Sequence, residues 1–485
     1  MPVPAIRVRA LNSAPLRPER PLLLYWMVAT RRAHDNYALD HCVQHARALG
    51  RPLVVLEALR ADHPHASARL HRFVLEGMRD TAVAFRDRPV TYYPYVERRG
   101  GEARGLVEAL AEHAALIVTD DWPSYFVPRM QAALAARVDV RVEAVDSCGL
   151  LPLRASARGF SRAFDYRRLV QRELAVHLAR PPRRDALRSP SLAPPAALPL
   201  AVARRWPTAL AELGDPAALL ATIRVPATPA PVATPGGSRA AERRLAAFVR
   251  AHLPTYDQER NDPSARATSG LSPYLHFGHV SPHRVLHVVA SAEDWSPARL
   301  ARAATGGREG AWGVGRGAEA FLDQLVTWRG LAFDSCARRD DLATAAAIPD
   351  WARRSLEKHA RDRRRWRYDL RALEGAATHD AVWNAAQRQL LQEGALHGWM
   401  RMLWGKKVLE WSASHEEAYD ALVTLNDRWA LDGRDPNSYA GIAWCFGRYD
   451  RPWAPEREIF GAVRYMSSES ALRRRGVKRY VAGER

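Results

Sequence analysis

Cysteine is scarce in this chain of 485 residues, and no long apolar segment occurs. The four cysteines, Cys42, Cys148, Cys336 and Cys445, lie too far apart for the paired spacing of a zinc site, and so few do not form a disulfide framework. No run of about 18 uncharged apolar residues is present, so no membrane-spanning helix is predicted. We therefore expect a protein of a reducing, cytoplasmic compartment that binds no metal.

Acidic residues are outnumbered by basic ones. The chain has 53 Asp and Glu against 72 Lys and Arg, a formal net charge of +19 and a pI near 10.3. A surface this basic attracts polyanions, which makes nucleic acid the first expected partner. A high-GC coding sequence would also enrich arginine, and that alternative stays open. Residues 353–371 hold nine Lys or Arg against three acids, a pattern typical of a solvated helix face; attraction of DNA is the alternative.

A glycine-rich phosphate loop is missing after the first predicted strand, which disfavours a dinucleotide there. Strand-like and helical segments alternate in this part of the chain, and the alternation predicts a Rossmann-like parallel sheet covered by helices. The predicted strands are 22–28, 52–59, 90–96, 115–121 and 141–146, and the predicted helices are 35–49, 67–85 and 104–113. Asp35 is the expected N-cap of the first helix. Asp120 and Asp121 end the fourth strand, either near a ligand pocket or as helix caps.

The composition changes twice along the chain, and these changes predict the domain boundaries. Residues 1–20 are basic without an apolar core and are expected to form a disordered leader. Residues 21–178 form the α/β domain, and residues 179–237, rich in proline and alanine, form a surface linker with one short helix. Residues 238–485 show helical periodicity almost throughout and predict an all-α domain. Within it, the glycine-rich residues 306–317 are expected to be a mobile surface insertion.

Four tryptophans stand in the stretch from Trp383 to Trp411. Trp404 and Trp411 are seven residues apart and therefore share one face of a helix. Large aromatic side chains in such a pattern usually pack a core. The alternative is a relay in which neighbouring indoles pass an electron, because indole is one of the few side chains that can lose one. Spacing alone does not decide between them.

Several segments resemble the class II photolyases, light-driven enzymes that split cyclobutane pyrimidine dimers in DNA. They include the opening strand and helix, YWMVATRRAHDNYALDHC (25–42), and four passages of the helical half: 256–281, 321–336, 383–411 and 425–453, the last followed by FGAVRYM (460–466). The resemblance implies a carbon–carbon lyase, expected as a monomer, that acts on double-stranded DNA containing pyrimidine dimers. It also implies FAD, active as FADH⁻, which on absorbing blue light gives an electron to a dimer flipped out of the duplex.

The resemblance assigns residues to the cofactor. Those matching the family's contacts to the FAD phosphates and ribityl chain are Tyr256, Thr268, Ser269, Gly270 and Leu271. Ser269 has a plain helix N-cap as its alternative. Asn426 matches the residue that faces flavin N5, and Arg401 with Asp432 matches an ion pair beside the ring system; a structural buried pair is the alternative. Trp404, Trp383 and Trp411 match the photoreduction relay, with Trp411 nearest solvent, whereas Trp399 is interpreted as packing.

The resemblance also assigns the substrate side. Trp328, Met402 and Trp444 match the wall of the dimer pocket. Arg260 and Trp453 match the residues that fill the gap in the duplex, and Arg464 matches a contact to the opened DNA. An arginine beside an aromatic wedge suits an unstacked gap.

One departure bears on catalysis. Where the family places a glutamate, this chain has Gln324, four residues before Trp328. An amide keeps a hydrogen-bond donor but cannot deliver a proton as a carboxylic acid can, so a lowered repair yield is expected. Gln324 is also the reason to retain a second hypothesis, a cryptochrome-like blue-light receptor without repair activity. An antenna chromophore in the first domain, an 8-hydroxy-deazaflavin or a folate, stays undecided.

Overall fold

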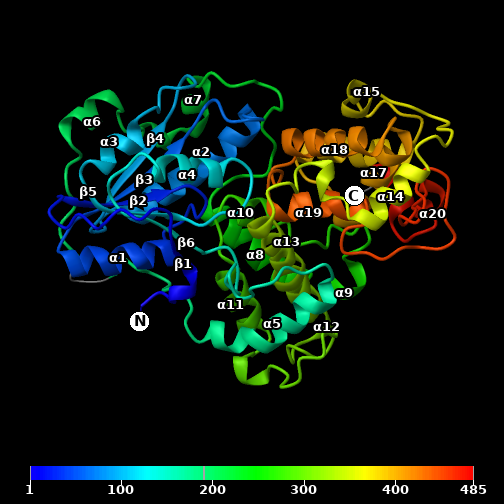
Figure 1. The fold of residues 1–485 in the computed structure, drawn as a ribbon, viewed down its shortest axis with the longest axis horizontal. Coiled ribbons are helices and arrows are strands. Elements are labelled where there is room, and N and C mark those ends of the chain that lie inside the picture. Colours follow the sequence, from blue (N-terminus) through cyan, green and yellow to red (C-terminus); the bar gives the residue numbers. More distant parts are fainter. Residues whose placement is uncertain (1, 189–191, 484–485) are drawn as a thin grey trace. The chain divides into compact units, whose positions relative to one another are not determined.

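The computed structural model describes residues 2–188 and 192–483, and the chain divides into two compact units (Figure 1). Unit 1 comprises Met1–Ala157, Glu173–Ala246 and Leu271–Ala292. Unit 2 comprises Arg158–Arg172, Ala247–Gly270 and Glu293–Arg485. Both units are assembled from separate stretches, so their limits differ from the predicted boundaries at 178 and 238.

Unit 1 is built on a six-stranded sheet with the order β1-β6-β5-β2-β3-β4. In sequence order the strands are β1 (Val8–Ala10), β2 (Leu22–Met27), β3 (Leu53–Leu59), β4 (Thr91–Val96), β5 (Ala114–Asp120) and β6 (Val142–Val145). Only β1 is antiparallel to its neighbour among these strands. All six residues of β2 are buried, as expected for a central strand covered on both faces. The predicted Rossmann-like α/β domain is confirmed.

Helices cover this sheet, and their ends follow local sequence signals. The covering helices include α1 (Tyr37–Leu49), α2 (Ala68–Phe85), α3 (Leu106–Ala111) and α4 (Val127–Ala135). The Asn36 side chain, and not Asp35, caps α1 by accepting a hydrogen bond from the Leu39 N–H. The prediction of Asp35 as the cap is therefore wrong; Asp35 lies one residue earlier with φ 49°. Gly50 ends α1 in the left-handed conformation, φ 61°.

The N-terminal segment is structured, in contrast to the expected leader. The 3-10 turn η1 (Ala5–Arg7) leads into β1, and Arg7 is 1% exposed. The Arg7 guanidinium donates hydrogen bonds to the backbone carbonyls of Asp146, Gly149 and Leu150. A long side chain with carbonyl acceptors explains how a segment without an apolar core is held in place.

The proline-rich region 179–237 packs on unit 1 and does not merely cross its surface. It contains α6 (Leu200–Arg205), η2 (Glu212–Gly214) and α7 (Pro216–Ala221); residues 189–191 lie outside the described part. Trp206, Leu213 and Leu219 are buried in the two cores of unit 1. Further along, α10 (Ser272–His276) and α11 (Pro282–Ala292) also belong to unit 1.

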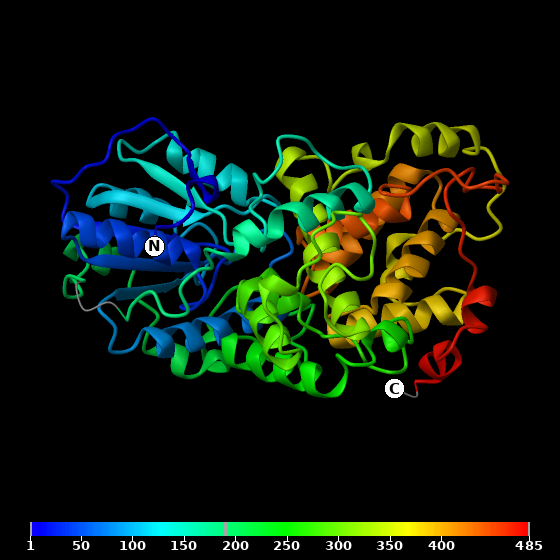
Figure 2. The same cartoon turned by 90° about the horizontal axis from the view of Figure 1, so that it is seen from below.

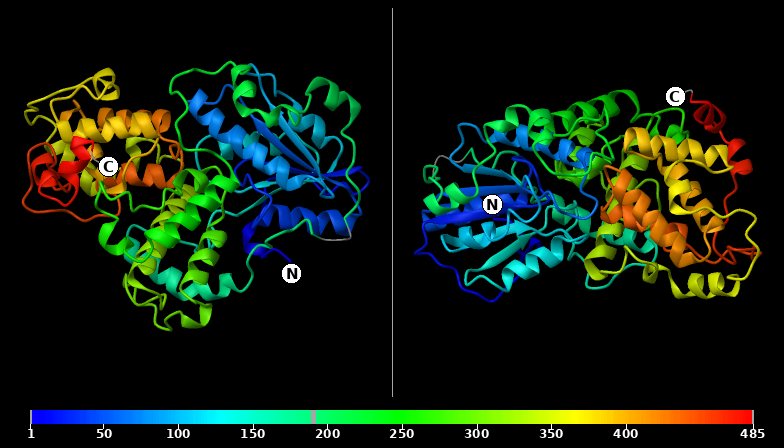
Figure 3. Two further views of the ribbon diagram at one scale, coloured as in Figure 1. Left: turned by 180° about the vertical axis from the view of Figure 1, so that it is seen from behind. Right: turned by 90° about the horizontal axis from the view of Figure 1, so that it is seen from above.

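Unit 2 contains helices and turns without a strand among its described residues. Its helices include α9 (Tyr256–Glu259), α12 (Arg316–Leu322), α13 (Arg329–Arg338), α14 (Asp350–Lys358), α15 (Leu370–Glu374), α16 (Ala381–Glu393), α17 (Gly398–Trp411), α18 (His415–Trp429), α19 (Pro436–Cys445), α20 (Ser468–Leu472) and α21 (Val477–Ala482). Helix α5 (Ala163–Leu178) and helix α8 (Ser238–Ala251) each run from one unit's segment into the other's. Helix α17 contacts α16, α18 and α19, and these helices lie side by side in Figures 2 and 3. Gly405 allows the close approach, since a Cβ there would stand 2.5 Å from Cys445 Sγ.

The glycine-rich residues 306–317 form a loop tied to the helix that follows them. The Glu319 carboxylate accepts hydrogen bonds from the N–H groups of Gly310, Ala311 and Trp312. The Trp312 indole is 6% exposed. These contacts anchor the segment that the sequence predicted to be mobile. None of the helices described is both long enough and apolar enough to cross a membrane.

Candidate active site in unit 2

Three indoles form a continuous buried stack between α16 and α17. The Trp383 ring lies parallel to that of Trp404, with centroids 6.4 Å apart and planes 4° from parallel. It meets the Trp411 ring edge-on at 5.6 Å. The Trp383 Nε1–H donates to the Trp404 carbonyl and the Trp404 Nε1–H donates to Gln387 Oε1. The structure therefore brings together all three tryptophans proposed for the relay.

The chain of rings continues beyond Trp411. All three indoles are buried, Trp411 at 2% exposure, although the resemblance placed it nearest solvent. The Trp411 ring meets Tyr368 at 5.2 Å and His379 at 5.5 Å. His379 in turn stacks on Trp366 at 4.4 Å, and Trp366 is 41% exposed. The aromatic path from the core of unit 2 thus reaches solvent at Trp366.

Asn426 is buried and held in one orientation. Its Nδ2 donates to Asp427 Oδ1 at 3.0 Å and to Ser438 Oγ at 2.6 Å. Asp427 is itself fixed by the Tyr439 hydroxyl and the Arg434 N–H. Because both amide hydrogens are used inside the protein, Asn426 has only its carbonyl oxygen to offer a ligand.

Arg401 and Asp432 form the predicted ion pair. The Arg401 Nη2 lies 3.4 Å from each oxygen of the Asp432 carboxylate, and the two side chains are only 17% and 12% exposed. Arg401 stands on α17 and Asp432 on the loop between α18 and α19. A cation fixed by one carboxylate at this spacing keeps donors for a second, anionic partner.

Segment 256–270 contributes the predicted phosphate-side residues. Tyr256 begins α9 and packs edge-on against Phe248 and Phe321, and burial raises the pKa of its hydroxyl. Gly270 has φ 62°, a conformation that favours glycine. Thr268, Ser269 and Gly270 are the last residues of the unit 2 segment Ala247–Gly270. Leu271 is the first residue of the next unit 1 segment and directly precedes α10. The proposed contacts of these four residues remain predictions.

Buried polar atoms without a protein partner occur beside α9. Among the described residues they include Asp257 Oδ1 and Arg260 Nε. Burial lowers the pKa of His397 to about 4, and its polar neighbours are Arg260 and Asp262. Buried polar groups are nearly always hydrogen-bonded, so unpaired atoms on one short helix and its C-cap fit a site for a polar ligand.

The predicted pocket wall has two stacked tryptophans. Trp328 lies face to face with Trp444, with centroids 4.5 Å apart and planes 14° from parallel. Gln324 and Trp328 belong to η4 (Asp323–Trp328), a π-helical turn between α12 and α13, and such turns occur often at functional sites. The Cys445 Sγ lies 4.0 Å from the Met402 carbonyl, which places Met402 of α17 next to α19, the helix that carries Trp444.

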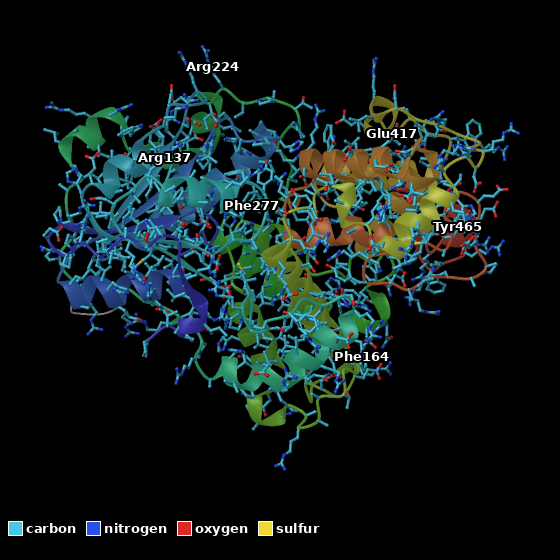
Figure 4. The ribbon with its side chains drawn as sticks, in the orientation of Figure 1. Arg137, Phe164, Arg224, Phe277, Glu417 and Tyr465 are labelled. Carbon is cyan, nitrogen blue, oxygen red and sulfur yellow. The ribbon has the colours of Figure 1, made fainter. Side chains whose placement is uncertain are left out.

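Two of the predicted DNA-contacting residues meet, and the third does not join them. The Arg464 guanidinium lies 5.0 Å from the ring centroid of Trp453, and Trp453 is 36% exposed. Tyr465, the residue after Arg464, is labelled in Figure 4 and packs edge-on against Phe460. Arg260 instead lies over Tyr256 at 6.0 Å. No interaction among the described residues links Arg260 to Trp453.

Comparison with known proteins decides the family. The sequence is 34% identical over 478 residues to the deoxyribodipyrimidine photo-lyase of Methanothermobacter thermautotrophicus, a match covering 98% of this chain and 97% of that protein. It is also 34% identical over 496 residues to the deoxyribodipyrimidine photo-lyase of Oryza sativa subsp. japonica, covering 98% and 90%. This chain belongs to the deoxyribodipyrimidine photo-lyase family. No protein-family model matches it.

A solved structure supports the fold of this chain. The crystal structure of a bacterial class III photolyase from Agrobacterium tumefaciens matches with a TM-score of 0.59 at 18% identity, covering 90% of this chain and 82% of the other. At that identity the likeness shows the fold alone. It agrees with an α/β part followed by a helical part.

Sequence reasoning missed several residues that contact the candidate site. Ser438 orients Asn426, yet it lies 12 residues further on, and nothing in its sequence context marks it. Trp366, which lies in the basic run 353–371, and His379 beyond that run extend the ring path. A fully buried lysine, Lys406, donates to the Cys445 carbonyl beside Met402; the GKK triplet gave no sign of burial.

Proposed function

We propose that this chain is a light-driven DNA repair enzyme of class II type that splits cyclobutane pyrimidine dimers. The observation that carries the proposal is the buried stack of Trp404, Trp383 and Trp411 in the unit that also holds Asn426 and the Arg401–Asp432 pair. A core needs aromatic packing but does not need three redox-active indoles in contact with one another. Family membership and the segments quoted above support the same reaction.

The residues present fit an FAD. The unpaired atoms of Asp257 and Arg260 offer partners for polar groups, and Tyr256 with residues 268–270 adds hydroxyls and N–H groups. Bound FAD would supply light absorption and one-electron chemistry that no side chain provides.

The protein's own groups favour the reduced, anionic form of such a cofactor. Asn426 offers an acceptor oxygen, which suits a protonated ring nitrogen and not an unprotonated one. Arg401 keeps a positive charge at the site, partly balanced by Asp432, and a fixed cation favours an anion in a poorly solvated place. The tryptophan stack provides a route by which electrons from solvent replenish the site.

The substrate side relies on flat apolar surface and one amide. Trp328 and Trp444 present indole surface against which an extruded pyrimidine pair can stack, which offsets the cost of removing it from the duplex. Gln324, four residues before Trp328 on the same π-helical turn, offers an N–H to a pyrimidine carbonyl, where it would stabilise developing negative charge. Trp453 and Arg464 form the exposed pair that would contact the gap left in the DNA.

Binding of damaged DNA tests this assignment and separates it from the cryptochrome-like alternative that Gln324 keeps open. We expect the full chain to bind an oligonucleotide duplex with one thymine dimer at least 100-fold more tightly than the undamaged duplex, measured in the dark at fixed salt. The Trp328→Ala variant should lose most of that preference. Equal affinity for both duplexes would refute a repair enzyme and leave a receptor that binds DNA without selectivity.

A further inference from the structure

Two histidines and a glutamate meet in unit 1, and none of them is among the residues assigned to repair. His41 and His45 stand one turn apart on α1, and Glu143 lies on β6. One ligand atom of each lies within 4.8 Å of the others. Sequence reasoning examined only cysteine spacing for metals; the His-x-x-x-His spacing on a helix was the signal it passed over.

The two imidazoles are directed at the same carboxylate oxygen. His41 Nε2 lies 2.7 Å from Glu143 Oε2, and His45 Nε2 lies 4.0 Å from that atom. The imidazole rings are in edge contact at 4.5 Å. A hydrogen bond accounts for the His41 distance but not for the orientation of His45. In a tetrahedral site with bonds of about 2.0–2.1 Å, ligand atoms lie about 3.3 Å apart, and the observed distances bracket that value.

The surroundings suit a cation with an open coordination position. Glu143 is 7% exposed, whereas the His45 side chain is 28% exposed, so solvent reaches the cluster from one side and can supply a further ligand.

We propose that His41, His45 and Glu143 form a binding site for a divalent transition metal, with Zn²⁺ as the ion that the donor set fits best. Two imidazole nitrogens and one carboxylate oxygen are typical zinc ligands. Bound there, the ion would join α1 to β6 across the face of the sheet and stabilise unit 1. The site does not depend on the proposed repair activity.

One residue opposes metal binding and gives the proposal a specific test. The Arg141 Nε donates to Glu143 Oε1 at 2.7 Å, and its positive charge stands beside the site. If the cluster is a metal site, Arg141→Met should tighten Zn²⁺ binding several-fold because a competing cation is removed. If the cluster is only an ion-pair network, Arg141→Met should create no affinity for Zn²⁺.

The experiment is a calorimetric titration of ZnCl₂ into the full chain after removal of metal with a chelator. We expect one saturable site with a dissociation constant in the micromolar range or below, and a rise in melting temperature with added Zn²⁺. His45→Ala and Glu143→Gln should each weaken binding at least tenfold. His287→Ala is the matched control, since His287 is an exposed histidine of the same unit on α11.

His45→Ala keeps the test decisive if other variants fail to fold, because its ring is partly exposed and lies 4.0 Å from Glu143. Circular dichroism establishes that each variant retains its helices. The proposal is overturned if the wild-type chain shows no saturable Zn²⁺ binding, or if His45→Ala and Arg141→Met bind with the wild-type affinity.

Discussion

At the scale of single residues, Gln324 sets the expected efficiency of repair. We expect Gln324→Glu to raise the number of dimers split per absorbed photon about twofold or more, since a carboxylic acid can deliver a proton where an amide cannot. Single-turnover repair at measured light dose checks this. Gln392→Glu, which adds the same charge at an exposed position at the end of α16, should change nothing. An unchanged yield in Gln324→Glu would show that the amide is sufficient.

Burial of Lys406 in the core of unit 2 lowers the free energy of unfolding by an amount that depends on pH. Burial lowers its pKa from 10.5 to about 8, so between these pH values the unfolded chain holds a proton that the folded chain lacks. The contribution of Lys406 to the free energy of unfolding therefore rises as pH increases from 8 to 10.5, and it is lowest below pH 8. Lys406→Met should stabilise the protein by about 1–2 kcal/mol at pH 7, because removing a buried charge outweighs the lost hydrogen bond.

Urea unfolding at pH 7 and at pH 10 measures this effect. The difference between Lys406→Met and the wild-type chain should shrink at pH 10, where the folded wild type holds a neutral amine. A difference that is constant across this range would mean that the lysine is charged in both states.

The residues that could be predicted are those whose neighbours in sequence carry a pattern. The resemblance predicted that the relay tryptophans lie together and that Arg401 pairs with Asp432. Both contacts are present. The orientation of Asn426 was not predictable, because it depends on Ser438 from the next helix. Asp35 failed as a cap because Asn36, which also prefers that position, reaches the Leu39 N–H.

At the scale of elements, the segment between α14 and α15 completes the path of rings from α16 and α17. Trp366 lies in that segment, exposed and stacked on His379, which touches Trp411. A radical that moves to the surface is further from its partner and recombines more slowly. We therefore expect Trp366→Phe to shorten the lifetime of the light-induced tryptophan radical several-fold, measured by transient absorption.

Trp399→Phe is the control for that measurement. Trp399 lies on α17 like Trp404 and Trp411 but packs against Arg474, and its replacement should leave the lifetime unchanged. Tyr368, which also contacts Trp411, is the competing exit. An unchanged lifetime in Trp366→Phe together with a shortened one in Tyr368→Phe would place the exit at the tyrosine.

Elements with strong periodicity were predictable, and short ones held by distant partners were not. Strands β2 to β6 lie within a residue or two of their predicted limits because each is a compact apolar run. Strand β1 was missed because its three residues, VRA, acquire strand structure only by pairing with β6. Helix α6 lies in a proline-rich region, and it is the burial of Trp206 and Val202 in the core that holds this segment.

At the scale of the whole molecule, buried neutral histidines make the fold sensitive to acid. His279 is 2% exposed, its Nδ1 accepts the Gly237 N–H, and burial lowers its pKa to about 3. The unfolded chain binds a proton there from about pH 6.5 downward and the folded chain does not. Stability is therefore lost as pH falls from 6.5 toward 3, by about 1.4 kcal/mol per pH unit for this group.

His279→Gln keeps an acceptor for Gly237 and removes the titrating ring. Between pH 6.5 and 5, we expect the unfolding free energy of this variant to fall less steeply than that of the wild-type chain. The two slopes should differ by about 1.4 kcal/mol per pH unit, which is the contribution of one proton. Denaturant unfolding across this range measures it. His287→Gln, at an exposed position, should keep the wild-type slope; an identical slope in His279→Gln would contradict the assignment.

The central claim is that unit 2 joins an electron path to a surface that accepts an extruded pyrimidine dimer. The most direct test illuminates the purified chain with blue light in the presence of a duplex holding one defined thymine dimer, and follows the recovery of intact thymines by chromatography. We predict multiple turnovers in light, none in the dark, and loss of repair in Trp328→Ala. Preserved dimers after illumination of protein that carries its flavin and binds the duplex would contradict the account.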